Sequence, residues 1–240
     1  ILHTTIDEIA PDIFRLSTLV PQVAPGGFSF NQFLIRDEQP FLFHTGMRQL
    51  YPSVSAAASQ IIDIADLRWI SFGHVEADEC GAMNLFLADA PRAEVIHGAT
   101  ACMVSLNDLA DRPPHIIGDD PLVIGTHQLR FLPTPHVPHG WESGLWFDET
   151  TRTLFSGDLF TQIGDVPAVV EDDIVAPALI AEELFHSTSY SPNLVPTLER
   201  LAALEPTTLA VMHGSSYRGD GAIQLRALAA GYAAARAEAA

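Results

Sequence analysis

The chain has 240 residues, of which 48% are hydrophobic and 18% are charged, so it can bury a substantial core and does not resemble a disordered segment. The formal net charge is −18 and all twelve basic residues are arginine, so the average surface would repel nucleic acid. No apolar run reaches the length of a membrane span, and we expect neither nucleic acid nor a membrane as a partner.

The predicted strands and helices form two successive β-rich blocks, each followed by helices. Short apolar or alternating runs that end at turn residues predict strands at 28–35, 41–43, 67–72, 93–96, 122–124, 129–132, 144–147, 153–155 and 209–212. Runs of helix-forming residues predict helices at 52–62, 81–88, 177–185, 194–204 and 223–236. This order predicts an α/β fold, an αββα sandwich that forms a single domain over residues 1–240.

Two cysteines, Cys80 and Cys102, are present, and neither belongs to a C-x-x-C pair. This spacing excludes a thiolate zinc site, a rubredoxin-type iron centre and a thioredoxin-type motif built within the chain. The sequence has no signal-peptide pattern, so we expect a cytoplasmic protein.

Short polar motifs follow the predicted strands. They lie at residues 73–81, 135–140, 156–158 and 211–214, with a weaker fifth at 44–46. Because strand ends meet at one rim of an α/β fold, we expect the side chains of these motifs to converge there.

The first motif contains His74, Glu76 and Asp78, spaced by two residues. In an extended loop this spacing directs all three side chains the same way. One imidazole and two carboxylates are a mixed nitrogen and oxygen donor set for a metal ion. Taken alone, the motif is also compatible with a polar loop on an acidic protein.

The motifs together resemble those of the metallo-β-lactamase superfamily, whose first motif is usually H-x-H-x-D-H. Later family positions match His136 in a T-P-x-H segment, Asp158 in a strand that ends S-G-D, and His213 after a late strand. The resemblance covers nearly the whole chain and implies a two-metal site. Its ligands would be His74, Glu76, Asp78, His136, Asp158 and His213.

The resemblance also implies how these ligands divide between the two metals. His74, Glu76 and His136 would bind one metal, Asp78 and His213 would bind the second, and Asp158 would bridge them. Paired metals of this kind lie about 3.5–4 Å apart.

Two positions depart from the usual motif. Glu76 stands where the second histidine is expected, and this H-x-E-x-D form resembles the flavodiiron proteins and the single-domain oxygen-binding diiron proteins. A carboxylate is a harder, anionic donor that favours iron over zinc. Glu79 stands where the motif usually ends in histidine; it either replaces that ligand or points away and leaves an open coordination position.

Other histidines have less specific surroundings. His139 lies three residues after His136 and could be a ligand or a proton donor, although we favour a pocket-lining or structural role. We expect His44, in the weaker fifth motif, to be structural.

The resemblance implies a diiron protein that binds or reduces dioxygen or nitric oxide. The 240 residues leave no room for a flavodoxin-like domain, so electrons would come from an external electron-transfer protein, or the chain would act as an oxygen sensor. The alternative is a dizinc hydrolase of an ester, lactone or thioester, in which two zinc ions replace the iron pair. A module that kept the fold and lost the chemistry is disfavoured by the six matched positions. Similarity to the family also suggests a homodimer.

Overall fold

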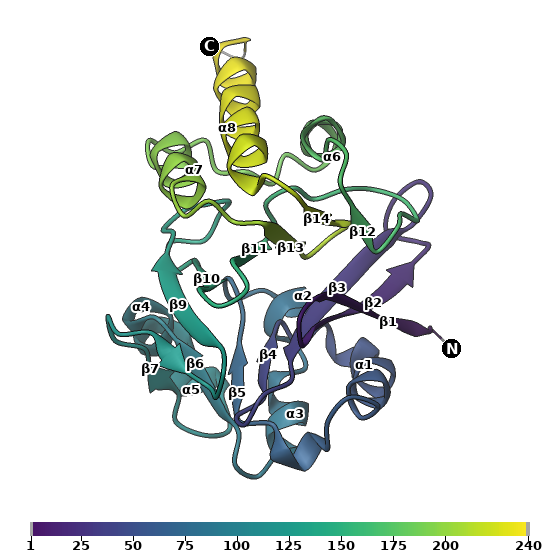
Figure 1. The fold of residues 1–240 in the computed structure, drawn as a ribbon, viewed down its shortest axis with the longest axis vertical. Helices are drawn as coiled ribbons and strands as arrows, with labels where there is room; N and C mark the ends of the chain where they lie inside the picture. The colour runs from purple at the N-terminus through teal and green to yellow at the C-terminus, as the bar shows by residue number, and fades with distance from the viewer. Residues whose placement is uncertain (1, 239–240) are drawn as a thin grey trace.

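The computed structural model of the chain describes residues 2–238. Two seven-stranded sheets pack face to face, with helices on the outer side of each (Figure 1). The first sheet and its helices come from the N-terminal half, and the second sheet and its helices come from the C-terminal half. The predicted α/β sandwich with an αββα order of layers is therefore confirmed.

The first sheet follows chain order from one edge to the other. Its strands are β1 (Thr4–Ala10), β2 (Ile13–Val20), β3 (Phe28–Ile35), β4 (Phe41–Phe43), β5 (Trp69–Ser71), β6 (Glu94–His97) and β7 (His115–Ile116). Strands β1 to β4 are antiparallel, and β4 to β7 run parallel to one another.

The second sheet has the order β12-β14-β13-β11-β10-β9-β8. Its strands are β8 (Leu122–Val123), β9 (Gln128–Pro133), β10 (Gly144–Asp148), β11 (Thr153–Gly157), β12 (Val169–Val170), β13 (Thr208–Val211) and β14 (Ser216–Arg218). Strands β11 and β13 are parallel neighbours, which brings their carboxyl ends to the same edge of the sheet.

The helices cover the outer faces of both sheets. The first sheet is accompanied by α1 (Tyr51–Ala58), α2 (Ala77–Cys80), α3 (Met83–Asp89), α4 (Ala99–Ala101) and α5 (Asn107–Leu109), with short helical turns η1 (Arg48–Leu50), η2 (Ile64–Asp66) and η3 (Cys102–Leu106). The second sheet carries α6 (Val175–Phe185), α7 (Leu194–Ala202) and α8 (Gly221–Glu238). Among residues 2–238, no helix is long and apolar enough to cross a bilayer.

Three apolar clusters fill the spaces between the four layers. Successive side chains of β3 point to opposite faces of the sheet and so enter different clusters. Phe33 packs between the two sheets, whereas Leu34 faces α1 and α3. Trp146 and Phe155 meet Phe33 from the second sheet, and the opposite face of that sheet packs on α6, α7 and α8. Burial on both faces makes the central strands rich in apolar residues, which is why they were recognisable from sequence.

The structure also contains elements that the sequence patterns did not predict, namely β1, β2, β7, β12, β14 and the helical segment from α4 to α5. The predicted helix at 52–62 ends earlier, at Ala58. A short helix, α2, begins at Ala77, inside the loop that was expected to be extended. Asp78 therefore lies in the first turn of a helix, and its side chain diverges from that of Glu76.

Candidate metal centre

The candidate residues gather at one edge of the sandwich, where strands from both sheets end. The loop after β5 carries His74 and Glu76 and continues into α2 with Asp78. Asp158 follows β11, and His213 lies two residues beyond β13. Because Gly157 pairs with Val211 in the parallel ladder, Asp158 and His213 leave the second sheet side by side.

One group of candidate ligand atoms forms around Glu76. The Nε2 atom of His74 lies 2.7 Å from Glu76 Oε2, and the Nε2 atom of His139 lies 3.2 Å from the same oxygen. Asp158 Oδ2 lies 3.8 Å from His74 Nε2 and 3.5 Å from His139 Nε2. Ligand atoms from these four residues all lie within 4.8 Å of one another, which is compact enough for one metal ion.

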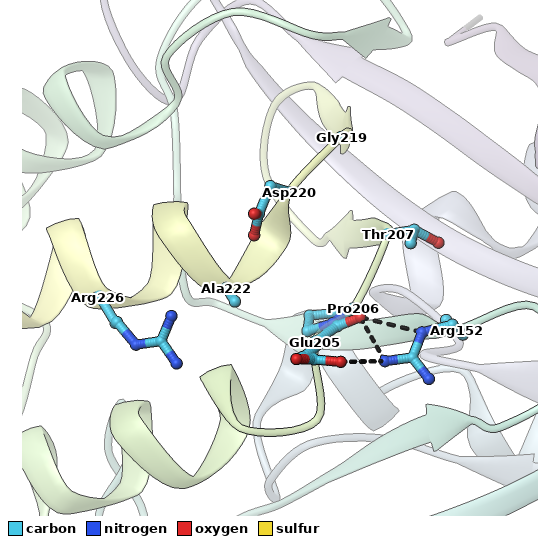
Figure 2. Close-up of a pocket in the computed structure, with 8 residues that line it drawn as sticks. All are labelled: Arg152, Glu205, Pro206, Thr207, Gly219, Asp220, Ala222 and Arg226. Carbon is cyan, nitrogen blue, oxygen red and sulfur yellow. Dashed lines mark hydrogen bonds and ion pairs between the residues drawn. The ribbon is translucent and has the colours of Figure 1, made fainter.

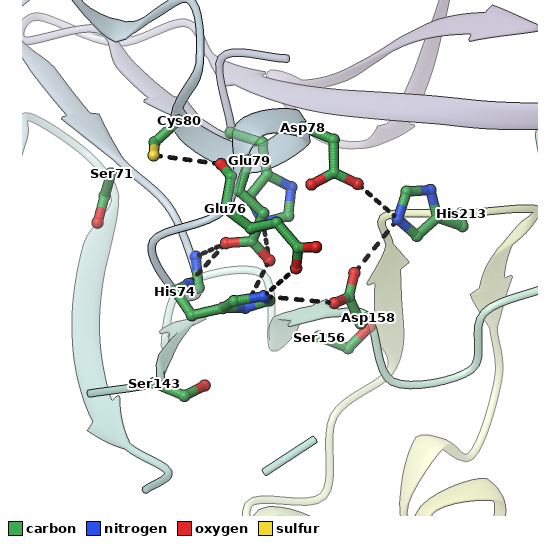
Figure 3. Close-up of polar contacts among 12 residues, drawn as sticks. Ser71, His74, Glu76, Asp78, Glu79, Cys80, Ser143, Ser156, Asp158 and His213 are labelled. Carbon is green, nitrogen blue, oxygen red and sulfur yellow. Dashed lines mark hydrogen bonds and ion pairs between the residues drawn. The ribbon is translucent and has the colours of Figure 1, made fainter. Parts of the chain in front are cut away.

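A second group forms on the other side of Asp158. The Nε2 atom of His213 lies 3.3 Å from Asp158 Oδ1 and 3.4 Å from Asp78 Oδ2. The two oxygens of Asp158 therefore face different donor groups, with Oδ2 toward the first and Oδ1 toward the second (Figure 3). This is the arrangement required of a carboxylate that bridges two cations.

His136 does not join either group. It is exposed and has a backbone φ of 65°, whereas the neighbouring Val137 is fully buried. Burial of Val137 anchors the loop so that His139 faces Glu76 and Asp158. The structure thus corrects the sequence expectation, because the loop after β9 brings His139 to the candidate centre in place of His136.

Glu79 is fully buried and turned away from the second group. Its Oε2 accepts hydrogen bonds from the backbone N–H groups of Gly73 and His74, each at 2.6 Å. Its Oε1 lies 3.1 Å from His74 Nδ1 and 3.6 Å from the Nε2 atom of His44. Of the two alternatives left open by the sequence, this geometry matches the one in which Glu79 points away.

Opposite charges in the cluster shift the pKa values of its histidines and carboxylates. Burial alone would lower the pKa of His74, but the Glu79 carboxylate and the hydrogen bond with Glu76 raise it to about 12. Burial likewise opposes protonation of His213, and the nearby carboxylates of Asp158 and Asp78 raise its pKa to about 10. Hydrogen bonds from His139 and His74 lower the pKa of Glu76 to about 2. In the metal-free protein, protonated imidazoles therefore balance the negative charge of the carboxylates, a role that bound cations would otherwise have.

The donor set fits a pair of metal ions. Asp78 Oδ1 is buried and accepts no hydrogen bond from the described residues, and buried Asp158 Oδ1 has only its ion pair with His213. Unpartnered buried carboxylate oxygens are costly unless a cation or water satisfies them. Three carboxylates and three imidazoles at these positions would supply mixed oxygen and nitrogen ligands to two ions.

Some residues that support the site were not identified from the sequence. His213 Nδ1 lies 2.8 Å from the carbonyl oxygen of Ser29, to which it can donate a hydrogen bond that leaves Nε2 free as a ligand. Ser29 lies in β3, almost 200 residues away, so no local pattern could have indicated this contact. The glycine at position 73 was a local signal of close packing in this loop, because a Cβ there would lie 3.1 Å from both oxygens of Glu79.

A separate hollow of about 500 Å³ lies near the start of β13 and α8, away from the candidate ligands (Figure 2). Arg152 donates hydrogen bonds to the carbonyl oxygens of Leu204 and Glu205, and Arg226 pairs with Glu199. Because both guanidinium groups are engaged by oxygens of the chain itself, this hollow is a weaker candidate for a functional site.

Comparison with known proteins identifies the family of the chain. The model of the ODP family beta lactamases matches residues 28–214. A diflavin flavoprotein of Thermosynechococcus vestitus is 28% identical over 202 residues, covering 80% of this chain and 34% of that protein. An anaerobic nitric oxide reductase flavorubredoxin of Salmonella arizonae is 27% identical over 205 residues, covering 81% of this chain and 42% of that protein. The chain thus spans well under half the length of these curated relatives.

Solved structures show the same fold. The flavodiiron core of Flv1 from Synechocystis superposes with a TM-score of 0.80 at 22% identity, covering 97% of this chain and 61% of that one. The rubredoxin oxygen:oxidoreductase of Desulfovibrio gigas superposes with a TM-score of 0.80 at 19% identity, covering 95% of this chain and 60% of that one. Because the family model matches well over half of its residues, the chain belongs to the ODP beta lactamase family, and its fold is that of flavodiiron cores.

Proposed function

We propose that this chain is a non-haem diiron protein that binds or reduces dioxygen or nitric oxide. The observation that carries the proposal is the position of Asp158, whose two oxygens face separate donor groups. His74, Glu76 and His139 would complete the first metal position, and Asp78 and His213 would complete the second.

Iron rather than zinc is proposed because of the number of carboxylates. Glu76, Asp78 and Asp158 supply hard, anionic oxygen donors, which stabilise the oxidised state of iron more than imidazole does. Among the relatives, the solved cores named flavodiiron and the curated nitric oxide reductase flavorubredoxin support the same choice.

The residues of the first position would give a small gas and protons access to the metals. The side chain of Glu76 is 52% exposed and that of His139 is 27% exposed, whereas His74 and His213 are buried. An iron pair supplies redox chemistry, and its two ferrous ions hold half of the four electrons needed to reduce dioxygen to water. The remaining electrons would come from a donor outside these 240 residues.

The first prediction concerns the metal and its electrons. We expect the anaerobically prepared protein to retain two ferrous ions, and to react with dioxygen once, without steady turnover on a nicotinamide cofactor alone. Elemental analysis and an oxygen electrode measure both outcomes. Glu76→His is expected to shift the metal preference toward zinc, because it replaces an anionic oxygen donor by a softer nitrogen.

The outcomes separate the competing functions. Uptake of two zinc ions with hydrolysis of a model ester or thioester, together with iron-loaded protein that is inert to dioxygen and nitric oxide, would establish the dizinc hydrolase instead. Cycling after addition of a rubredoxin-type donor supports a reductase. A reaction that cannot be made to cycle by any donor supports an oxygen-binding sensor.

A further inference from the structure

The side chain of Glu79 occupies a site that is built around it. It lies in the first turn of α2 and is completely buried. Both backbone N–H groups of the Gly73–His74 segment donate to Oε2, so that oxygen is fully engaged. Gly73 makes this approach feasible, since a Cβ at that position would press on both carboxylate oxygens at 3.1 Å.

The other carboxylate oxygen of Glu79 contacts the far side of the His74 ring. It lies 3.1 Å from Nδ1, while the opposite ring nitrogen, Nε2, faces Glu76 and Asp158. An imidazole that donates its Nδ1–H group to a carboxylate presents the lone pair of Nε2 to a metal. The contact between Oε1 and Nδ1 also restrains the orientation of the ring.

The peptide group of Glu79 is held as firmly as its carboxylate. The backbone N–H of Thr45 donates to the Glu79 carbonyl oxygen at 2.7 Å, and Thr45 Oγ1 donates to it at 3.2 Å. Buried His44 flanks Oε1 on the other side. The segment after β4, which the sequence singled out as a weaker motif, therefore acts by fixing Glu79.

We propose that Glu79 is a positioning residue for His74 rather than a metal ligand, an inference that rests on the proposed two-metal centre. Its consequence is that the two metal positions are unequal. The first has four protein donors, from His74, Glu76, His139 and Asp158, whereas the second has three, from Asp78, His213 and Asp158. At limiting metal, the first position fills before the second.

The test isolates the first position in a His213→Ala background, which removes a donor of the second. In that background, Glu79→Gln is expected to weaken Co²⁺ or Zn²⁺ binding by about 10–100-fold. The amide oxygen would keep the two backbone N–H donors, so the amide NH₂ would face His74 Nδ1 and favour a proton on Nε2, which blocks ligation. The measurements are competition with a chromophoric chelator and the Co²⁺ absorption spectrum.

A matched control uses a carboxylate that supports the same loop without contacting the His74 ring. Glu142 Oε1 accepts a hydrogen bond from the backbone N–H of Val75 at 3.0 Å. Glu142→Gln is therefore expected to bind Co²⁺ nearly as the His213→Ala parent does. If Glu79→Gln fails to fold, Gly73→Ala keeps the charge, displaces the carboxylate, and is expected to weaken the first position as well.

Each result has a distinct meaning. Unchanged affinity and an unchanged Co²⁺ spectrum for Glu79→Gln in the His213→Ala background would overturn the role of Glu79 and leave the metal centre intact. Selective loss of the second metal from Glu79→Gln in the otherwise unaltered chain would make Glu79 a ligand and also overturn it. Failure of the unaltered protein to bind either Co²⁺ or Zn²⁺ would instead overturn the proposed function.

Discussion

His139 lies on the exposed side of the candidate centre, and its Nε2 faces Glu76 and Asp158 at 3.2 and 3.5 Å. His136, three residues earlier on the same loop, points to solvent. The two histidines therefore form a natural pair for testing the site, because they share a loop and a side chain but differ in direction.

We predict that His139→Ala removes metal from the first position, whereas His136→Ala retains it. Loss of a direct donor should lower affinity at least as much as loss of a hydrogen bond that only orients a ligand, which costs about 10–100-fold. Metal content after equilibrium dialysis measures the difference. Equal metal loss in both variants, or loss only with His136→Ala, would show that the loop binds metal in another conformation.

Site residues could be predicted from the sequence where a motif directly follows a strand. They could not be predicted where the direction of a side chain depends on packing. His74, Glu76, Asp78, Asp158 and His213 come from such motifs, and the structure brings them together. The choice between His136 and His139 depends on burial of Val137, which a local pattern does not reveal. The direction of Glu79 depends on backbone N–H groups in the loop before it, which no spacing rule describes.

At the scale of single elements, the turn between β10 and β11 is organised by Asp148. This carboxylate is completely buried, and it contacts His127 Nδ1 at 2.9 Å. It accepts hydrogen bonds from the backbone N–H groups of Thr150 and Thr151 and from the Thr151 hydroxyl. The hairpin that ends at Asp158 is thus tied at its opposite end to the loop before β9.

Asp148→Ala is expected to lower the free energy of unfolding by roughly 3 kcal/mol, because it leaves several donors unpaired and one imidazole without its carboxylate. Asp172→Ala, at an exposed position, is the control and should change stability by less than about 0.5 kcal/mol. Urea denaturation followed by circular dichroism measures both. A loss below about 1 kcal/mol for Asp148→Ala would mean that water replaces the lost contacts.

Elements were predictable where burial imposes a strong pattern. Strand β3 is buried along its whole length, and the strand was predicted with its observed bounds. Strand β1 is partly exposed and carries Asp7 and Glu8, so its composition did not indicate a strand. The two-residue strands β7 and β12 are too short for any periodicity and are defined only by their partners in the sheets.

At the scale of the molecule, the candidate centre joins the two halves of the sandwich. His74, Glu76 and Asp78 belong to the half that contains the first sheet, whereas His139, Asp158 and His213 belong to the half that contains the second. A bound metal pair would therefore stabilise the contact between the sheets as well as the site. In a chain with a net charge of −18, two cations would also reduce the repulsion among carboxylates.

We predict that stabilisation by metal grows as pH rises from about 6.5 to 8. In the metal-free protein the pKa values of His74 and His213 are raised to about 12 and 10, so both stay protonated in this window. Unfolded histidines lose their protons above about 6.5, so the metal-free fold binds more protons and becomes less stable as pH rises. Metal must displace these protons, so its affinity rises over the same range.

Thermal unfolding with and without a chelator measures this effect, and metal at 100 times its dissociation constant contributes about 2.7 kcal/mol per site. The lowered pKa of Glu76, about 2, keeps that carboxylate ionised throughout, so it adds no slope of its own. A difference in melting temperature that is flat or shrinks between pH 6.5 and 8 contradicts the prediction.

The division of the sheets between the two halves of the chain has a consequence for synthesis on the ribosome. The first sheet is complete at Ile116, but the aromatic side chains of its inner face, such as Phe33 and Phe43, are covered by Trp146 and Phe155 from residues not yet made. At about 5–20 residues per second, the second half takes on the order of ten seconds to emerge. During that interval these aromatic side chains lack their packing partners, and transiently exposed apolar surface of this kind favours aggregation.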